Sequence, residues 1–150
     1  MRSILFTLII FISISAAAQE KWKSLVASAN KKMSNQDYRG ALKDLDEATD
    51  DCPKCPTPHF RKVMALAELK EFDKAKKALK KGKEYSAESN MHYYYTAILQ
   101  WKQGEKEETL LTLQEFLSKD STSSLAASMY EIRASIRLTQ KLNDDAYADT

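Results

Sequence analysis

The sequence predicts an all-α fold made of repeated helix pairs, and three observations support this prediction. Residues that break helices are scarce, since the 150-residue chain has only three glycines and three prolines. Alanine, leucine, lysine and glutamate, which favour helices, are abundant. A pattern of aromatic and small residues also recurs every 34 residues, which indicates an array of similar helical hairpins.

Residues 1–18 have the organisation of a secretory signal peptide. The positive Arg2 precedes an apolar run over residues 4–14, and three alanines follow at 16–18. This run is shorter than the ~20 residues that span a bilayer, so we expect cleavage after Ala18 rather than an uncleaved membrane anchor. The remaining chain is then exported, periplasmic or extracellular, with no transmembrane segment of its own.

The second helix of each predicted pair begins with an aromatic residue and a small residue three places later. Tyr38 and Ala41 recur as Phe72 and Ala75. Small residues let two helices approach closely, and the aromatic side chains fill the wedge between neighbouring pairs. A single pair cannot cover its own apolar face, so we expect the pairs to stack.

The first helices repeat with the same period. Leu25 and Ala29 in the first copy correspond to Tyr93 and Ala97 in the third, whereas the second copy has His59 at the large position. The period and pattern resemble the tetratricopeptide repeat, a helix–turn–helix unit of 34 residues. The resemblance implies an α-solenoid of three such repeats.

The third copy is degenerate, because Lys106 and Thr109 occupy its aromatic and small positions. Beyond it, Leu125, Met129 and Ile132 follow one apolar stripe, which we interpret as part of the C-terminal capping helix that such arrays need. The predicted segments are the signal peptide at 1–18, repeats at 19–55, 56–89 and 90–123, the capping helix at 124–140, and a flexible tail at 141–150.

The resemblance also implies a partner-binding groove, because the first helices of tetratricopeptide repeats line a concave face. The alternative is that the aromatic residues of the third repeat belong to the core, and the exposure of Trp101 distinguishes the two. Some tetratricopeptide domains hold a C-terminal carboxylate with lysine, arginine and asparagine; only Asn30 is retained here, so we do not expect that mode. The mapped groove residues are Asn30, Met33, Phe60, Met64, Tyr94, Ile98 and Trp101.

The two cysteines, Cys52 and Cys55, lie in a Cys-Pro-Lys-Cys segment between the first two repeats. We favour a disulfide that staples this turn, as suits an oxidising compartment. A redox pair is less favoured, because Cys52 ends a helix, where the negative end of the dipole opposes a thiolate. A metal site would need His59 and His92 as further ligands, so no metal and no cofactor is predicted.

The chain carries 23 basic and 21 acidic residues, a balance that argues against a dedicated nucleic-acid-binding protein. Residues 37–51 and 105–120 are mainly acidic, and residues 61–83 are mainly basic. We interpret these runs as solvated helix faces with some pairing between repeats. The alternative is a lysine patch for an anionic partner such as an envelope polysaccharide or lipid headgroups.

The sequence shows no combination of nucleophile, base and acid and no glycine-rich phosphate loop, so we predict no enzyme. The main hypothesis is a protein–protein interaction scaffold of the bacterial cell envelope, which binds a protein or peptide through its concave aromatic face. Two alternatives remain open. One is a redox or metal-handling protein that uses Cys52 and Cys55, and the other is a self-associating homo-oligomer whose groove accepts a helix of a second copy.

Overall fold

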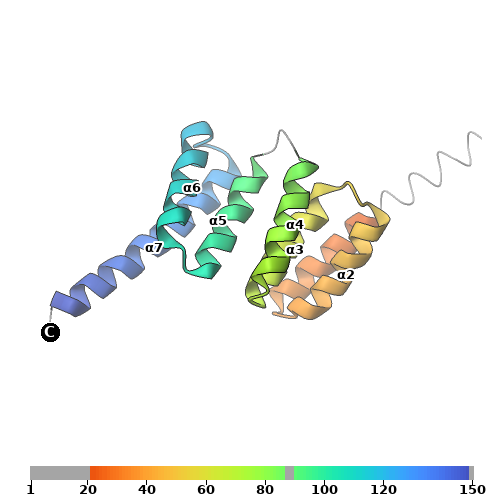
Figure 1. Ribbon diagram of the computed structural model, residues 1–150, viewed down its shortest axis with the longest axis horizontal. Helices are drawn as coiled ribbons and strands as arrows, with labels where there is room; N and C mark the ends of the chain where they lie inside the picture. The colour runs from red at the N-terminus through yellow and green to blue at the C-terminus, as the bar shows by residue number, and fades with distance from the viewer. Residues whose placement is uncertain (1–20, 87–89, 149–150) are drawn as a thin grey trace, which may run out of the picture. The chain divides into compact units, whose positions relative to one another are not determined.

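The computed structural model describes residues 21–86 and 90–148, and these are helices joined by turns, without a strand (Figure 1). The all-α prediction is therefore confirmed. Nowhere in these two ranges is a helix both long enough and apolar enough to cross a membrane. The predicted signal peptide at 1–18 lies outside the described residues. The chain forms two compact units, which meet in sequence at Ala87 and Glu88.

The first unit consists of two helix pairs. A first helix, described over residues 21–34, is followed by α2 (Tyr38–Asp51), α3 (Pro56–Glu68) and α4 (Phe72–Glu84). Helix α3 packs between α2 and α4 (Figure 1). The predicted small residues lie where helices touch, because Ala29, Ala41 and Ala75 have no exposed surface.

The first helix is joined to α2 by an apolar core with ion pairs beside it. Val26, Ala29 and Leu45 are buried together, with Trp22 and Met33 packed against them. Two ion pairs flank this core, Lys21–Glu47 at 3.0 Å and Lys32–Asp44 at 2.7 Å. Burial of apolar surface contributes most of the stability here, and the exposed Lys21–Glu47 pair contributes little.

The contact between α3 and α4 depends on a glycine. Phe60 of α3 has no exposed surface, and its ring lies against Gly82 of α4. A Cβ atom added to Gly82 would lie 2.7 Å from two carbons of that ring. Gly82 therefore lets the backbone of α4 approach the Phe60 ring directly.

The second unit contains one further helix pair and a single helix. They are α5 (Met91–Gln103), α6 (Lys106–Lys119) and α7 (Ser124–Ala148). Helix α7 packs on α6 and α5. Tyr95, Leu113, Phe116 and Met129 fill the core of this unit. Thr109, at the degenerate small position, is fully buried, and its hydroxyl donates to the Glu105 carbonyl at 2.6 Å, so no hydroxyl is left unsatisfied.

The turn within each pair repeats most faithfully in its backbone. Gln36, Lys70 and Gly104 all have a positive φ, of 62°, 60° and 82°. They lie 34 residues apart, so the third copy keeps the turn even where its side chains depart from the pattern. An amide five residues beyond its acceptor carbonyl closes each turn: Asp37 to Lys32 and Glu71 to Leu66 at 2.9 Å, and Glu105 to Gln100 at 3.0 Å.

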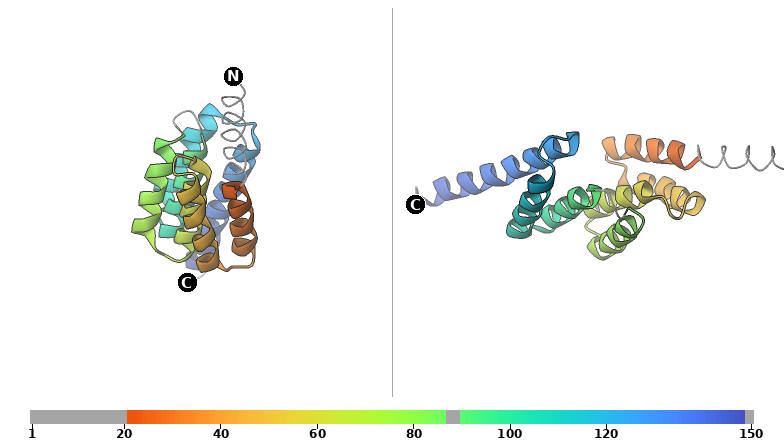
Figure 2. Two further views of the ribbon diagram at one scale, coloured as in Figure 1. Left: turned by 90° about the vertical axis from the view of Figure 1, so that its right-hand side faces the viewer. Right: turned by 90° about the horizontal axis from the view of Figure 1, so that it is seen from above.

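Helix α7 is longer than predicted. We expected a helix over 124–140 and a flexible tail over 141–150, but the helix continues to Ala148. The prediction was wrong because no glycine or proline interrupts this stretch. The start was predicted correctly, since the Ser123 hydroxyl accepts from the Ala126 amide at 3.2 Å. Figures 1 and 2 show the end of α7 extending beyond α5 and α6.

Candidate functional site

A groove of about 320 Å³ lies in the first unit between the first helix, the start of α2 and α3. Each of the three helices contributes from the face that its packing leaves open. The lining residues are Asn30, Met33, Ser34, Tyr38, Arg61, Met64 and Glu68.

Three of the residues mapped from the sequence line this groove together. Asn30 and Met33 come from the first helix, and Met64 comes from α3. All three side chains are half-buried, so each keeps some accessible surface. The structure places them in one depression; that they bind a partner stays a prediction.

Phe60 does not belong to the groove. It was mapped to the concave face, but it is fully buried against Gly82, so a partner cannot touch it. The exposed face of α3 is instead turned by one residue, or about 100°. Arg61 and Glu68 line the groove in the places expected for Phe60 and Ala67. The signal was present in the sequence, since a polar residue follows each of these two buried apolar ones.

The groove contains two buried polar atoms that have no hydrogen-bond partner among the described residues. They are the Asn30 side-chain oxygen, Oδ1, and the Nε of Arg61. Another guanidinium nitrogen of Arg61, Nη1, contacts the sulfur of Met64 at 3.7 Å. A buried polar atom without a partner destabilises the protein by about 1–3 kcal/mol. A ligand that supplied the missing partners would remove that cost.

The three residues mapped to the second unit have different environments. Ile98 is only 8% exposed and belongs to the core, so it is not available to a partner. Tyr94 is half-buried and packs edge-on against Tyr95, with 5.1 Å between ring centroids. Trp101 is 39% exposed, and the Lys102 ammonium lies 5.9 Å from its ring centroid. The core interpretation therefore holds for Ile98 but not for Trp101.

The cysteine pair forms a disulfide across the turn between the two helix pairs of the first unit. Cys52 caps the end of α2 and Cys55 precedes α3, with 5.4 Å between their Cα atoms. This separation lies in the usual range for disulfides. The geometry therefore supports the predicted staple.

His59 acts as a packing residue next to this turn. It is 4% exposed, its Nε2 is 2.8 Å from the Pro53 carbonyl, and its ring centroid lies 5.5 Å from that of Tyr85. Burial chiefly lowers the pKa of His59, and the positive Lys62 and Lys81 lower it further. In the part of the chain that the structure describes, no three histidine, cysteine or carboxylate side chains are grouped to hold a metal.

These features define an all-α helical-repeat protein with a small groove between the first helices of two pairs. No known family model and no curated protein sequence matches the chain. Solved structures do match. The first tetratricopeptide domain of Spaghetti (RPAP3), bound to the HSP90 peptide SRMEEVD, has a TM-score of 0.60 and 17% identity, covering 79% of this chain and 94% of that domain.

Two human structures give similar values. The first tetratricopeptide domain of human RPAP3 has a TM-score of 0.61 and 16% identity, covering 78% of this chain and 95% of the domain. The second domain of human RPAP3, in complex with the HSP70 peptide SGPTIEEVD, has a TM-score of 0.60 and 11% identity, covering 77% of this chain and 98% of the domain. The chain thus has the tetratricopeptide-repeat fold, as its 34-residue pattern predicted.

Proposed function

We propose that this protein is a protein-interaction module that binds an extended peptide segment of a partner in the groove between the first helix and α3. One observation carries the proposal: the unpartnered polar atoms of Asn30 and Arg61 lie in the same groove as Met33 and Met64. Methionine side chains adapt to irregular apolar partners, and an amide and a guanidinium can pair with peptide polar groups. These are binding groups, so we propose binding rather than catalysis.

The similar domains support peptides as the class of ligand, since two of them are described with bound peptides. The local charges narrow the class for this chain. Arg61 favours an oxygen acceptor, such as a carboxylate or a backbone carbonyl, whereas Glu68 on the same groove disfavours a strongly acidic segment. We propose a peptide that places one acceptor group at Arg61 and an apolar side chain between Met33 and Met64.

We further propose that the protein acts outside the bacterial cytoplasm, in the cell envelope. The charge and apolar pattern of residues 1–18 supports this, and so does the disulfide, since disulfides persist in oxidising compartments. N-terminal sequencing of the protein recovered from fractionated cells tests the proposal. We expect a chain that begins at Gln19 in the envelope or medium, and an uncleaved chain in the cytoplasm would contradict it.

Selection from a random peptide library tests the groove itself. Peptides that bind the purified protein are labelled, and their affinities are measured by fluorescence anisotropy. We expect Arg61→Ala and Met64→Ala each to weaken binding by about tenfold, because each removes a contact of 1–2 kcal/mol. Lys31→Ala, an exposed change on the first helix, is the matched control. Peptides that bind all three variants as tightly as the unchanged protein would contradict the proposal.

A further inference from the structure

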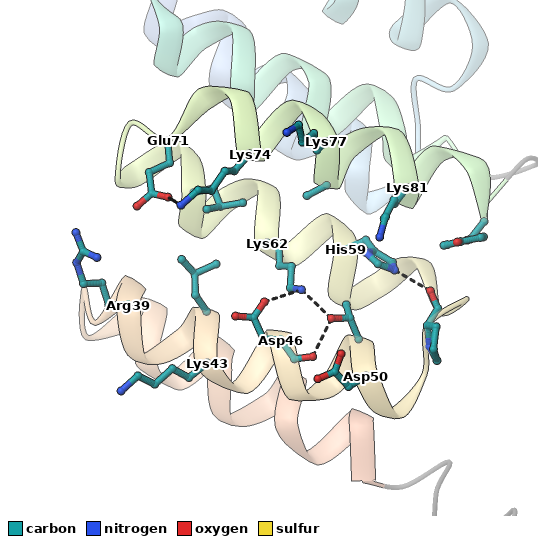
Figure 3. Close-up of a pocket in the computed structure, with 16 residues that line it drawn as sticks. Arg39, Lys43, Asp46, Asp50, His59, Lys62, Glu71, Lys74, Lys77 and Lys81 are labelled. Carbon is teal, nitrogen blue, oxygen red and sulfur yellow. Dashed lines mark hydrogen bonds and ion pairs between the residues drawn. The ribbon is translucent and has the colours of Figure 1, made fainter.

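The largest hollow in the first unit is a second groove, distinct from the one above. It encloses about 870 Å³ between α2 and α4, with α3 beneath (Figure 3). Leu42, Leu66 and Ala78 supply its apolar surface. Leu66 and Ala78 are nearly fully buried, so they form the floor. The groove therefore offers an apolar surface with charged side chains on both sides.

The charges that border this groove are mostly positive. On α4, Lys74 is paired with Glu71 at 2.6 Å, but Lys77 and Lys81 have no ion pair with any described residue. The same holds on α2 for Arg39 and Lys43. Four uncompensated cations around one hollow concentrate a positive potential there. An anionic ligand is favoured at this place.

Part of the border is already neutralised. Lys62 donates to Asp46 and to the Thr49 hydroxyl, each at 2.7 Å, and so is not free for a ligand. Asp50 adds a negative charge at the far end of the α2 border (Figure 3). A ligand is expected to place its acids beside Lys77 and Lys81 rather than beside Asp50.

The C-terminal end of the same chain has the complementary composition. Residues 142–150 include three aspartates and no basic residue, together with Leu142 and Tyr147. Helix α7 extends past its last core residue, Ile136, and Leu138 is 61% exposed. In this unit, therefore, the helix end is not needed for packing. As a helix of 1.5 Å rise per residue, nine residues span about 13 Å, against about 16 Å from Arg39 to Asp50 along α2.

We propose that the groove between α2 and α4 receives the acidic C-terminal segment, residues 142–150, of a second copy of this chain. The acids of the segment pair with the cations of the groove, and its apolar residues cover Leu42 and Leu66. The contact is heterologous, since a groove on one copy meets a different surface on the other. It does not involve the Asn30–Arg61 groove, so the two proposals fail independently.

Sedimentation of the purified protein over a range of concentrations tests the proposal. We expect concentration-dependent association that weakens when salt rises from about 50 mM to about 300 mM, as the Debye length shortens. Lys77→Gln/Lys81→Gln should weaken association by about tenfold. Asp144→Asn/Asp145→Asn/Asp149→Asn should weaken it by a similar factor. The control Lys76→Gln/Lys80→Gln removes two lysines of α4 that do not line the groove and should leave association unchanged.

Charge exchange separates docking from a general charge effect. Lys77→Glu/Lys81→Glu and Asp144→Lys/Asp145→Lys should each abolish association, and an equimolar mixture of the two variants should restore it. A protein that stays monomeric at low salt overturns the proposal, including the case in which a chain's own tail fills the groove. Association that survives both sets of changes overturns it too, because the contact then uses another surface. Circular dichroism confirms that each variant is folded.

Discussion

At the scale of single residues, three positions share a left-handed backbone at the turn inside each helix pair. Gly104 adopts it freely, but Gln36 and Lys70 adopt it against the steric cost of a side chain. The sequence pattern did not reveal these positions, because two of the three are not glycine. A shared backbone conformation constrains the residue type only weakly, so the structure shows the repeat here and the sequence does not.

This strain predicts that Lys70→Gly stabilises the protein. Relief of the strain outweighs the greater entropy of glycine in the unfolded chain, so we expect a gain of about 0.5 kcal/mol in urea unfolding. Lys31→Gly, inside the first helix, is the control and should cost about 1 kcal/mol. A loss in both variants would show that the turn at Lys70 is not strained.

His59 predicts a pH dependence of stability. Burial holds the pKa of His59 below its ordinary value, so the unfolded chain binds the proton more readily. Its contribution is therefore full above the unfolded pKa of about 6.5 and is lost as the pH falls below it. Urea unfolding at about pH 7.5 and pH 5.5 should show a decline that His59→Gln reduces and His92→Gln does not. An equal decline in all three proteins would assign the effect to other groups.

At the scale of elements, α3 shows both the success and the limit of the sequence prediction. Its place and length follow from the 34-residue pattern, and so does the burial of Ala75 against it. The face that it leaves open was misassigned by one residue, because Phe60 was taken as a groove residue. Which apolar residue turns inward depends on Gly82, a contact between two helices that periodicity within one helix does not encode.

That contact predicts the effect of Gly82→Ala. The new Cβ atom would lie 2.7 Å from the ring of Phe60, which is fully enclosed and cannot move aside. We expect a loss of about 1–3 kcal/mol in unfolding free energy, as for other overpacked cores. Phe60→Leu should recover part of it in the double variant. Additive losses would mean that the ring is not the obstacle.

The disulfide constrains the connection between α2 and α3. In the chain-entropy treatment, closing so short a loop stabilises the fold by about 2 kcal/mol. Cys52→Ser/Cys55→Ser should lower the unfolding free energy by that amount without changing the helical circular dichroism spectrum. Peptide binding should be unaffected, since neither cysteine lines the Asn30–Arg61 groove. Lost peptide binding in a folded variant would instead indicate a functional role for the pair.

At the scale of the whole molecule, the chain has a repeat fold whose first unit presents two dissimilar grooves. One is small and holds unpartnered polar atoms beside methionines, and the other is larger and bordered by lysines. The sequence predicted the fold, because repetition multiplies a weak signal. It predicted the small groove only in part, since Arg61 lies there through the rotation of α3. A repeat fold by itself names no partner, and the side chains of the groove carry that information.

The central claim is that the Asn30–Arg61 groove binds peptides. Amide chemical-shift mapping tests it most directly, by titrating a library-selected peptide into the isotope-labelled protein and recording which backbone amides respond. The account predicts that the largest changes fall within residues 30–38 and 61–68, which contain the groove, and that Arg61→Ala suppresses them. Changes confined to α4 or to the second unit, with residues 30–38 and 61–68 unaffected, would contradict it.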